Sequence, residues 1–362
     1  MKIGIVDPFP RKTSTGIQTY TRKVIKYLSR LTPLVVYTSV DEDFRQLGVE
    51  IRKIHPSKID THLKRFSWEQ FSLPWLTKED KINLLFMPLP EVPIFVDIPV
   101  VAVVHDLIPL MMSKYHSPEY KLFFFSTLQT LKRAKGVITD SHHTLNNLKE
   151  LKIFTGIKRI KVIYPGVEVA KSFPRILKYE EYIPYILYVG GFAPYKNIKT
   201  LLLAYSKLRE ELPHRLLLVG WGTPKQIQDI SSFISSQHLK ERVFIFQELP
   251  EKELHWLYSN CACFVFPSLY EGFGLPVLEA LASRAVVICS NLPSLVEIGG
   301  DAVIYFNPNS LDELTTSLLR AIFDKKLREE LKEKSSFRAK LFTWEKTAAE
   351  IFDFIQETLT SP

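Results

Sequence analysis

Two glutamates, Glu271 and Glu279, bracket a glycine-containing turn in the segment PSLYEGFGLPVLEA, residues 267–280. The turn follows an apolar run typical of a strand, and Pro276 suits the first position of a new helix, where its missing N–H is not needed. Unpaired amides and the positive end of the helix dipole attract phosphate to such a terminus. Glu279 would fall in the first turn and could accept hydrogen bonds from a vicinal diol, whereas Glu271 would lie closer to the reacting end of a ligand. The amides that we expect at this terminus belong to Phe273, Gly274 and Leu275.

Glycine is scarce in this chain and its placement is informative. Eight of the 14 glycines form four close pairs in the second half of the sequence, at positions 190 and 191, 220 and 222, 272 and 274, and 299 and 300. Three pairs directly follow an expected strand or the short loop after it, which indicates backbone that approaches a ligand closely; ordinary strand-to-helix turns are the alternative. No pair forms a dinucleotide or P-loop fingerprint, so both of those cofactor classes lose support.

His105 is a second candidate site residue. It follows an apolar strand and precedes Asp106, so we expect it at the carboxyl edge of a sheet. A histidine that is only structural is the alternative. His142 and His143 have no carboxylate or cysteine partner at ligand spacing, and we therefore expect no metal site.

The elements that must position these residues alternate in a βα pattern, typical of parallel sheets. Expected strands lie at 2–6, 34–37, 84–87, 100–104, 136–139 and 161–164 in the first half, and at 185–189, 215–219, 243–246, 261–266, 285–289 and 302–305 in the second. We predict two doubly wound α/β domains, residues 1–166 and 185–342, joined by a linker over 167–184. A final helix within 343–362 would cross back onto the first domain. Open sheets of this kind bind ligands at the carboxyl ends of their strands, and a cleft between the domains is the expected site.

Composition agrees with two folded domains. The 362 residues are 46% hydrophobic and 24% charged, a composition far from that of disordered chains. The longest strongly apolar uncharged stretch, residues 98–104, is too short to cross a bilayer, and the N-terminus is typical of a buried strand rather than a signal peptide. We therefore expect a cytoplasmic protein. The three cysteines lie in apolar runs and are expected in the core.

Charge is uneven along the chain. Residues 1–165 hold 25 Lys and Arg against 15 Asp and Glu, whereas residues 166–362 hold 22 against 24. Without a zinc-finger spacing, an RNP motif or a basic repeat, nucleic acid is not the expected partner. A basic N-terminal domain suits anionic lipid, with peripheral contact at the inner membrane face, or a phosphorylated acceptor; a solvated basic surface is the alternative.

The glutamate pair resembles the E-x7-E motif of retaining GT-B glycosyltransferases of family four. Further motifs extend the resemblance over nearly the whole chain: VHDL at 104–107, WEQ at 68–70 ending in LP at 73–74, YVG at 188–190 with Pro194, Lys196 and Asn197, and FTWE at 342–345. The Trp-Glu-Gln and Pro-x-Lys-Asn forms resemble the mannosyltransferase-type branch. The family resemblance implies a GT-B fold with a nucleotide diphosphate sugar in the C-terminal domain and a glycan or lipid-linked acceptor against the N-terminal domain.

The resemblance also implies roles for individual residues. Glu279 would hold the ribose hydroxyls, Glu271 the hydroxyls of the transferred sugar, and Lys196 the leaving diphosphate, although a solvated loop lysine is the alternative. His105 would lie near the sugar and the leaving group. The backbone groups that would contact the donor belong to Gly16, Gly190, Phe273, Gly274 and Leu275.

The implied reaction transfers a hexosyl group, with mannosyl favoured, and retains the anomeric configuration without a protein nucleophile, a metal or another cofactor. Many relatives carry Arg at the position of Gly191, so Lys196, Arg11 or Lys12 would supply the missing charge; Gln247 and Arg284 also stand where relatives often have glycine. Two alternatives stay open. One is a noncatalytic nucleotide-sugar-binding subunit of a glycan-assembly complex, and the other is a hydrolase that uses Glu271 and Glu279 as acid and base without a nucleotide.

Overall fold

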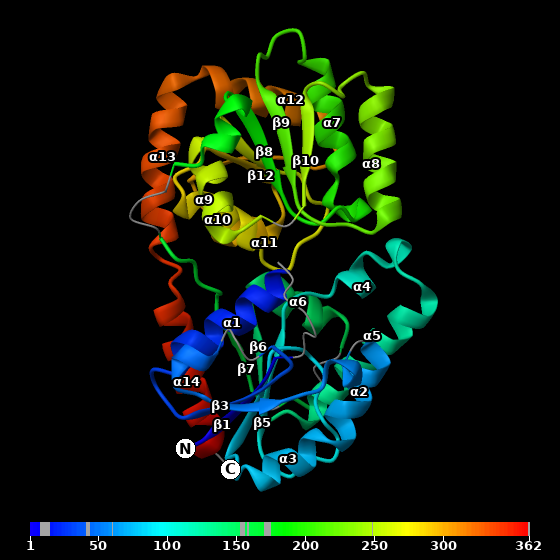
Figure 1. Cartoon of the computed structure of the whole chain (residues 1–362), viewed down its shortest axis with the longest axis vertical. Helices are drawn as coiled ribbons and strands as arrows, with labels where there is room; N and C mark the ends of the chain where they lie inside the picture. The colour runs from blue at the N-terminus through cyan, green and yellow to red at the C-terminus, as the bar shows by residue number, and fades with distance from the viewer. Residues whose placement is uncertain are drawn as a thin grey trace. The chain divides into compact units, whose positions relative to one another are not determined.

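The computed structural model describes residues 1–7, 15–40, 44–59, 61–152, 156–157, 159–169, 175–247 and 249–360. The chain divides into two compact units, each with its own parallel sheet (Figure 1). Unit 1 comprises Met1–Gly166 and Thr343–Pro362, and unit 2 comprises Val167–Phe342. The expectation of two doubly wound α/β domains is confirmed, whereas the assignment of acceptor and donor to one domain each stays a prediction.

Unit 1 contains a seven-stranded sheet in the order β3-β2-β1-β4-β5-β6-β7, with every neighbouring pair parallel. The strand order reverses between β1 and β4. The five strands from β2 across to β6 are buried along their whole length, because helices cover both faces. Their sequences are therefore apolar apart from Asp7, Thr38 and Thr139 at three of the carboxyl ends. The strands are β1 (Ile3–Asp7), β2 (Leu34–Thr38), β3 (Glu50–Lys53), β4 (Leu84–Met87), β5 (Val100–Val104), β6 (Gly136–Thr139) and β7 (Ile160–Val162).

Helices from both ends of the chain cover one face of this sheet. There α1 (Gly16–Leu28) and α14 (Trp344–Thr360) lie side by side (Figure 1) and share one core cluster with the strands. The opposite face packs against a second cluster. That cluster includes side chains of α2 (His62–Phe71), α3 (Leu73–Glu79), α5 (Pro118–Thr130) and α6 (His142–Glu150), and the short α4 (Ile108–Met111) precedes α5.

Unit 2 contains a six-stranded parallel sheet in the order β10-β9-β8-β11-β12-β13, which reverses between β8 and β11. Its strands are β8 (Tyr185–Val189), β9 (Arg215–Val219), β10 (Val243–Phe246), β11 (Cys263–Phe266), β12 (Val287–Ser290) and β13 (Val303–Phe306). One face packs against α7 (Ile198–Lys207), α8 (Pro224–Ser236) and α12 (Leu311–Phe323). Elsewhere in the unit α10 (Leu275–Ala282) packs among α9 (Glu251–Asn260), α11 (Pro293–Gly299) and α13 (Lys325–Ala339).

Two further expectations concerned the burial of the cysteines and the absence of a membrane-spanning segment. Cys261, Cys263 and Cys289 are buried free thiols, as predicted. Within the described part of the chain, no helix combines the length and the apolar character that crossing a membrane requires.

Candidate functional site

The loops after β8 and β11 meet at the point where the strand order of unit 2 reverses. Because β8 and β11 are parallel neighbours, their carboxyl ends lie at the same sheet edge, and such reversal points are where open α/β sheets bind ligands. A backbone hydrogen bond from Leu269 N to Tyr195 O, 2.8 Å long, joins the two loops. The segments that sequence analysis singled out at 190–197 and 267–275 therefore form one site.

Asn197 locks these loops together. Its side-chain nitrogen donates to the carbonyl oxygens of Pro267 and Pro308, each at 3.0 Å, so it bridges the loops after β11 and β13. Its own backbone is left-handed, with φ of 58°, a conformation that asparagine tolerates better than most residues. Thr200 Oγ1 donates to the remaining amide oxygen at 2.7 Å. Asn197 thus fixes the lysine that precedes it.

Lys196 and Glu271 form an ion pair in the middle of the site. Lys196 Nζ donates to Glu271 Oε1 at 2.7 Å, and the two side chains are only 16% and 8% exposed. The ammonium group also lies 5.7 Å from the centre of the Phe266 ring. On the other side, Ser294 Oγ donates to the Glu271 carbonyl oxygen at 2.8 Å. The structure therefore brings together two residues that are 75 positions apart, and their charges balance where burial strengthens electrostatics.

The helix α10 starts shortly after Glu271 in the chain. Gly274 is the N-cap and has a left-handed φ of 116°, and a Cβ there would lie 2.5 Å from Leu295 Cδ2, so only glycine fits. The helix begins at Leu275, and Pro276 is its second residue rather than its first. The Phe273 side chain is buried and packs edge-on against Phe342. Phe273 can therefore serve a ligand only through its backbone.

Glu279 lies one turn into α10 and is half-buried. The hydroxyl of Tyr258, a fully buried residue of α9, donates to Glu279 Oε2 at 3.1 Å. Burial and then the neighbouring Glu279 carboxylate raise the pKa of Tyr258 well above its usual value, so it stays a hydrogen-bond donor. Tyr258 thus orients Glu279. Sequence analysis missed it because its position in an amphipathic helix is typical of a core residue.

At Gly190 the loop after β8 lies close to the backbone at the end of β9, at the same edge of the unit 2 sheet. Its amide donates to Val219 O at 2.9 Å, and a Cβ on Gly220 would overlap the Gly190 carbonyl. The hydroxyl of buried Tyr188 donates to Gly191 O at 2.7 Å. One glycine of each sequence pair, namely Gly190, Gly220, Gly274 and Gly300, has a positive φ.

His105 lies in unit 1, at the carboxyl end of β5. Its Nδ1 is 2.6 Å from Asp140 Oδ2, and its Nε2 is 2.8 Å from the Pro88 carbonyl oxygen. Burial acts to lower the pKa of His105, but Asp140, by charge and hydrogen bond, together with Pro88 O and Asp106, outweighs it, so the pKa is raised. Asp106 itself accepts a hydrogen bond from Ile108 N at 2.9 Å.

The remaining expected residues are scattered. Gly16, the exposed first residue of α1, follows the N-cap Thr15 in unit 1, and Arg11 and Lys12 lie outside the described residues. Arg284, at a position where relatives often have glycine, has a left-handed φ of 58° and is exposed after α10. Across the described ranges, no group of three or more His, Cys, Asp or Glu side chains could hold a metal ion, and metal independence stays a prediction.

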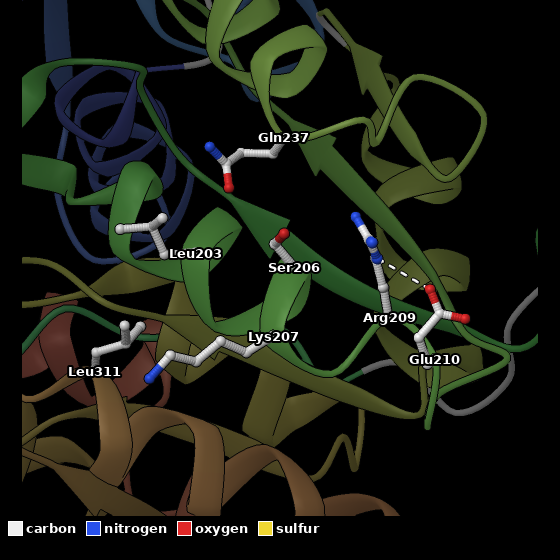
Figure 2. Close-up of a pocket in the computed structure, with 7 residues that line it drawn as sticks. All are labelled: Leu203, Ser206, Lys207, Arg209, Glu210, Gln237 and Leu311. Atoms are coloured by element: carbon white, nitrogen blue, oxygen red, sulfur yellow. Dashed lines mark hydrogen bonds and ion pairs between the residues drawn. The ribbon is translucent and has the colours of Figure 1, made fainter.

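A separate hollow of about 410 Å³ lies against α7 in unit 2 (Figure 2). There Arg209 pairs with Glu210 (Figure 2). Lys207 pairs with Asp312, so the charged side chains that line the hollow have neighbouring partners. It contains none of the expected site residues and is not part of the candidate site. Its lining consists of Leu203, Ser206, Lys207, Arg209, Glu210, Gln237 and Leu311.

Comparison with family models and curated proteins gives a consistent result. Residues 14–171 match the model described as Glycosyltransferase Family 4, and residues 171–336 match that described as Glycosyl transferases group 1. O-antigen chain mannosyltransferase B of Escherichia coli is 31% identical over 250 residues, which are 67% of this chain and 66% of that protein. The serotype-specific mannosyltransferase WbdA of E. coli is 32% identical over 264 residues, 68% of this chain but only 32% of that protein. O-antigen chain mannosyltransferase RfbU of Salmonella typhimurium is 25% identical over 318 residues, 82% of this chain and 84% of that one.

Solved structures share the fold at low sequence identity. Sucrose-phosphate synthase of Thermosynechococcus elongatus superposes with a TM-score of 0.81 at 18% identity, covering 98% of both chains. Anabaena HepE in complex with UDP-glucose superposes with a TM-score of 0.79 at 16% identity, covering 99% of this chain and 100% of that one. The chain therefore shares its two-sheet architecture over its whole length with these proteins.

Proposed function

Because the chain belongs to the GT-B glycosyltransferases of family 4, we propose that it transfers a mannosyl group, with retention, from a nucleotide diphosphate sugar to a glycan or lipid-linked acceptor. A sugar-transferring enzyme follows from the family itself. Mannose and an O-antigen-type glycan are supported by the names of the relatives, several of which are O-antigen mannosyltransferases. The observation that carries the site is the Lys196–Glu271 ion pair beside the start of α10, at the reversal point of the unit 2 sheet.

In this proposal different residues of the site bind different parts of the donor. The amides of residues 273–275 and the Lys196 ammonium would bind the diphosphate, because a helix start and a cation both favour negative charge. Glu271 would accept hydrogen bonds from sugar hydroxyls, and Glu279, oriented by Tyr258, would accept them from the ribose. Lys196 would then be shared between Glu271 and the phosphate, so its charge is already in place when the leaving group becomes more negative.

We propose that transfer needs no protein nucleophile. The bond between the anomeric carbon and the diphosphate oxygen breaks first, giving a short-lived oxocarbenium-like species. The acceptor oxygen then bonds to the anomeric carbon on the same face, and its proton passes to the departing phosphate oxygen. Glu271 is already held by Lys196 and by Ser294, an arrangement that suits an orienting group better than a free nucleophile.

A donor panel tests the proposal. GDP-mannose, GDP-fucose, UDP-glucose and UDP-galactose are each incubated with the chain and with mannose-terminated oligosaccharides, with and without EDTA, and products are identified by mass spectrometry and NMR. We expect an α-linked mannosyl product from GDP-mannose, unchanged by EDTA. Glu279→Gln is expected to weaken donor binding by about tenfold, and Glu210→Gln, at an exposed glutamate of the same unit, is the matched control.

Three other outcomes would contradict the proposal in different ways. A β-linked product would exclude retention, since the donor sugar is α-linked. Tight donor binding in calorimetry with neither transfer nor hydrolysis would indicate a noncatalytic subunit. Glycan cleavage without any nucleotide would indicate a hydrolase.

A further inference from the structure

The side chain of His105 is enclosed by hydrogen-bond acceptors on both ring nitrogens. Nδ1 faces a carboxylate oxygen of Asp140 at 2.6 Å and Nε2 faces the carbonyl oxygen of Pro88 at 2.8 Å. The His105 and Asp140 side chains are only 10% and 6% exposed. The two contacts come from different parts of unit 1, because Pro88 follows β4 and Asp140 follows β6.

This geometry determines where the protons lie. A carbonyl oxygen has no hydrogen to give, so Nε2 must donate to Pro88. A carboxylate also accepts, and since imidazole is more basic than a carboxyl group, the proton shared with Asp140 belongs to Nδ1. Among the described residues, two further ionisable groups lie near the ring: Asp106, whose charge favours the same state, and Tyr20, whose ring meets the imidazole edge-on.

Pro88 begins the loop over residues 88–99, which we call the 88–99 loop and which contacts α2 and α5. Gln70 of α2 accepts from Ile94 N at 2.7 Å, and Thr130 of α5 accepts from Val92 N at 2.9 Å. Arg65, also on α2, donates to Glu91 Oε1 at 2.7 Å. Gln70 of the Trp-Glu-Gln motif and Arg65 therefore tether the loop that begins at Pro88 to α2. The loop leaves β4 at the reversal point of the unit 1 sheet.

We propose that Asp140 is a positioning residue that keeps His105 as a fixed imidazolium during sugar transfer. His105 then contributes an oriented positive charge and not a proton, because both of its N–H groups are already committed to Asp140 and Pro88. The effect of this charge on sugar transfer rests on the proposed function, whereas the protonation of the His105 ring is a property of the folded chain alone. The protonation state and the catalytic effect can therefore be tested, and can fail, separately.

The protonation is measured on the full chain without substrate. Long-range ¹H–¹⁵N NMR of the ¹⁵N-histidine-labelled protein should show one residue with both nitrogens protonated at pH 7, a signal that is lost in His105→Gln. In Asp140→Asn we expect the pKa of the same residue to fall, because burial then disfavours the charged ring without the carboxylate that offsets it. If no histidine of the unmodified chain has both nitrogens protonated at pH 7, the inference is overturned, and this outcome needs no variant to fold.

Activity supplies the second test. Above pH 7 we expect Asp140→Asn to lower kcat at least tenfold with a smaller change in KM for the donor, and to recover partly as pH falls toward 5.5 because the imidazole regains its proton. A purely structural defect would not be rescued by acid. Asp353→Asn, at an exposed aspartate of α14, is the control and should match the unmodified chain. If the pH profile of kcat for Asp140→Asn runs parallel to that of the unmodified chain, the catalytic part of the inference is overturned. If the unmodified chain is inactive but His105 carries both protons, only the proposed function is contradicted.

Discussion

At the scale of single residues, Lys196 and Glu271 neutralise each other at the expected position of the diphosphate. Lys196→Ala should lower kcat by about 10²–10³-fold, because the leaving group loses a cation that stabilises its developing negative charge. The free energy of unfolding should fall by about 1–3 kcal/mol, since Glu271 is left buried without its partner. Steady-state kinetics and urea unfolding measure the two effects.

Lys207→Ala is the matched control for this lysine. Lys207 ends α7, the helix that Lys196 precedes, and it also forms an ion pair, but with exposed Asp312. Exposed pairs contribute little, so we expect less than about 1 kcal/mol and no change in kcat. Equal kinetic losses in both variants would remove Lys196 from the donor site.

Glu69 of the Trp-Glu-Gln motif predicts a pH dependence of stability. Burial, opposed by the Arg65 charge and aided by the Glu91 charge, raises the pKa of Glu69 from 4.5 to about 8. Because the folded chain holds this proton more tightly than the unfolded chain, the contribution of Glu69 to stability is complete below pH 4.5 and is lost as pH rises to about 8. Glu69→Gln should therefore be more stable than the unmodified chain at pH 8.5, by about 1–3 kcal/mol.

Chemical denaturation at pH 5 and pH 8.5 checks this expectation, with Glu79→Gln as a control because that side chain is 44% exposed. Arg65 keeps its 2.7 Å contact to Glu91 in the variant. If Glu69→Gln is less stable by the same amount at both pH values, Glu69 is ionised and acts as a partner of Arg65.

The sequence predicted site residues whose types carry chemistry, but not the residues that orient them. Lys196, Glu271 and Glu279 stand in recognisable loops. Tyr258 and Asp140 do not stand in recognisable motifs, because the role of each depends on a contact with a residue in another segment of the chain. Short-range patterns contain no information about such contacts.

At the scale of elements, the start of α10 depends on Gly274. Gly274→Ala would place a methyl group against Leu295 and hold a non-glycine residue at φ of 116°. We expect a loss of at least about 2 kcal/mol in the free energy of unfolding and weaker donor binding, because the amides of the first turn are displaced. Thermal denaturation and donor titration by calorimetry measure both.

Gly48→Ala is the control for Gly274→Ala, because it introduces backbone strain without a steric clash. Gly48 also has a positive φ, of 69°, but a Cβ there would meet nothing within 4 Å. Its replacement should cost only about 1 kcal/mol and leave donor binding unchanged. If the two variants weaken donor binding equally, the start of α10 is not the phosphate site.

The buried strands were predictable and the polar elements were not. The strands β1, β2, β4 and β5 are apolar up to their last residue at least, and they were expected within one residue of their observed ends. The edge strand β3, of sequence EIRK, was missed because its side chains are exposed or half-buried and polar. The helix α13 was missed because it is highly charged, with few buried residues.

At the scale of the whole molecule, the chain returns to the unit in which it began. The final helix α14 packs beside α1 on the unit 1 sheet, where Ile351, Phe354 and Ile355 join the core. Sequence periodicity identified this helix. The sequence also led us to expect that it crosses back onto the first domain, and the structure places it in unit 1.

Phe354 tests how far the stability of unit 1 depends on the last helix. Its ring lies directly over β6, where a Cβ on Gly136 would be 2.8 Å from Phe354 Cε1, and the side chain is 3% exposed. Phe354→Ala should cost about 3–5 kcal/mol by opening a cavity. Since unit 2 has its own core, peptides of β1 and β6 should lose hydrogen-exchange protection, whereas those of β8 and β11 should keep it. Phe337→Ala, at an exposed phenylalanine of α13, should change neither set; equal loss of protection in both units after Phe354→Ala would show that they unfold as one.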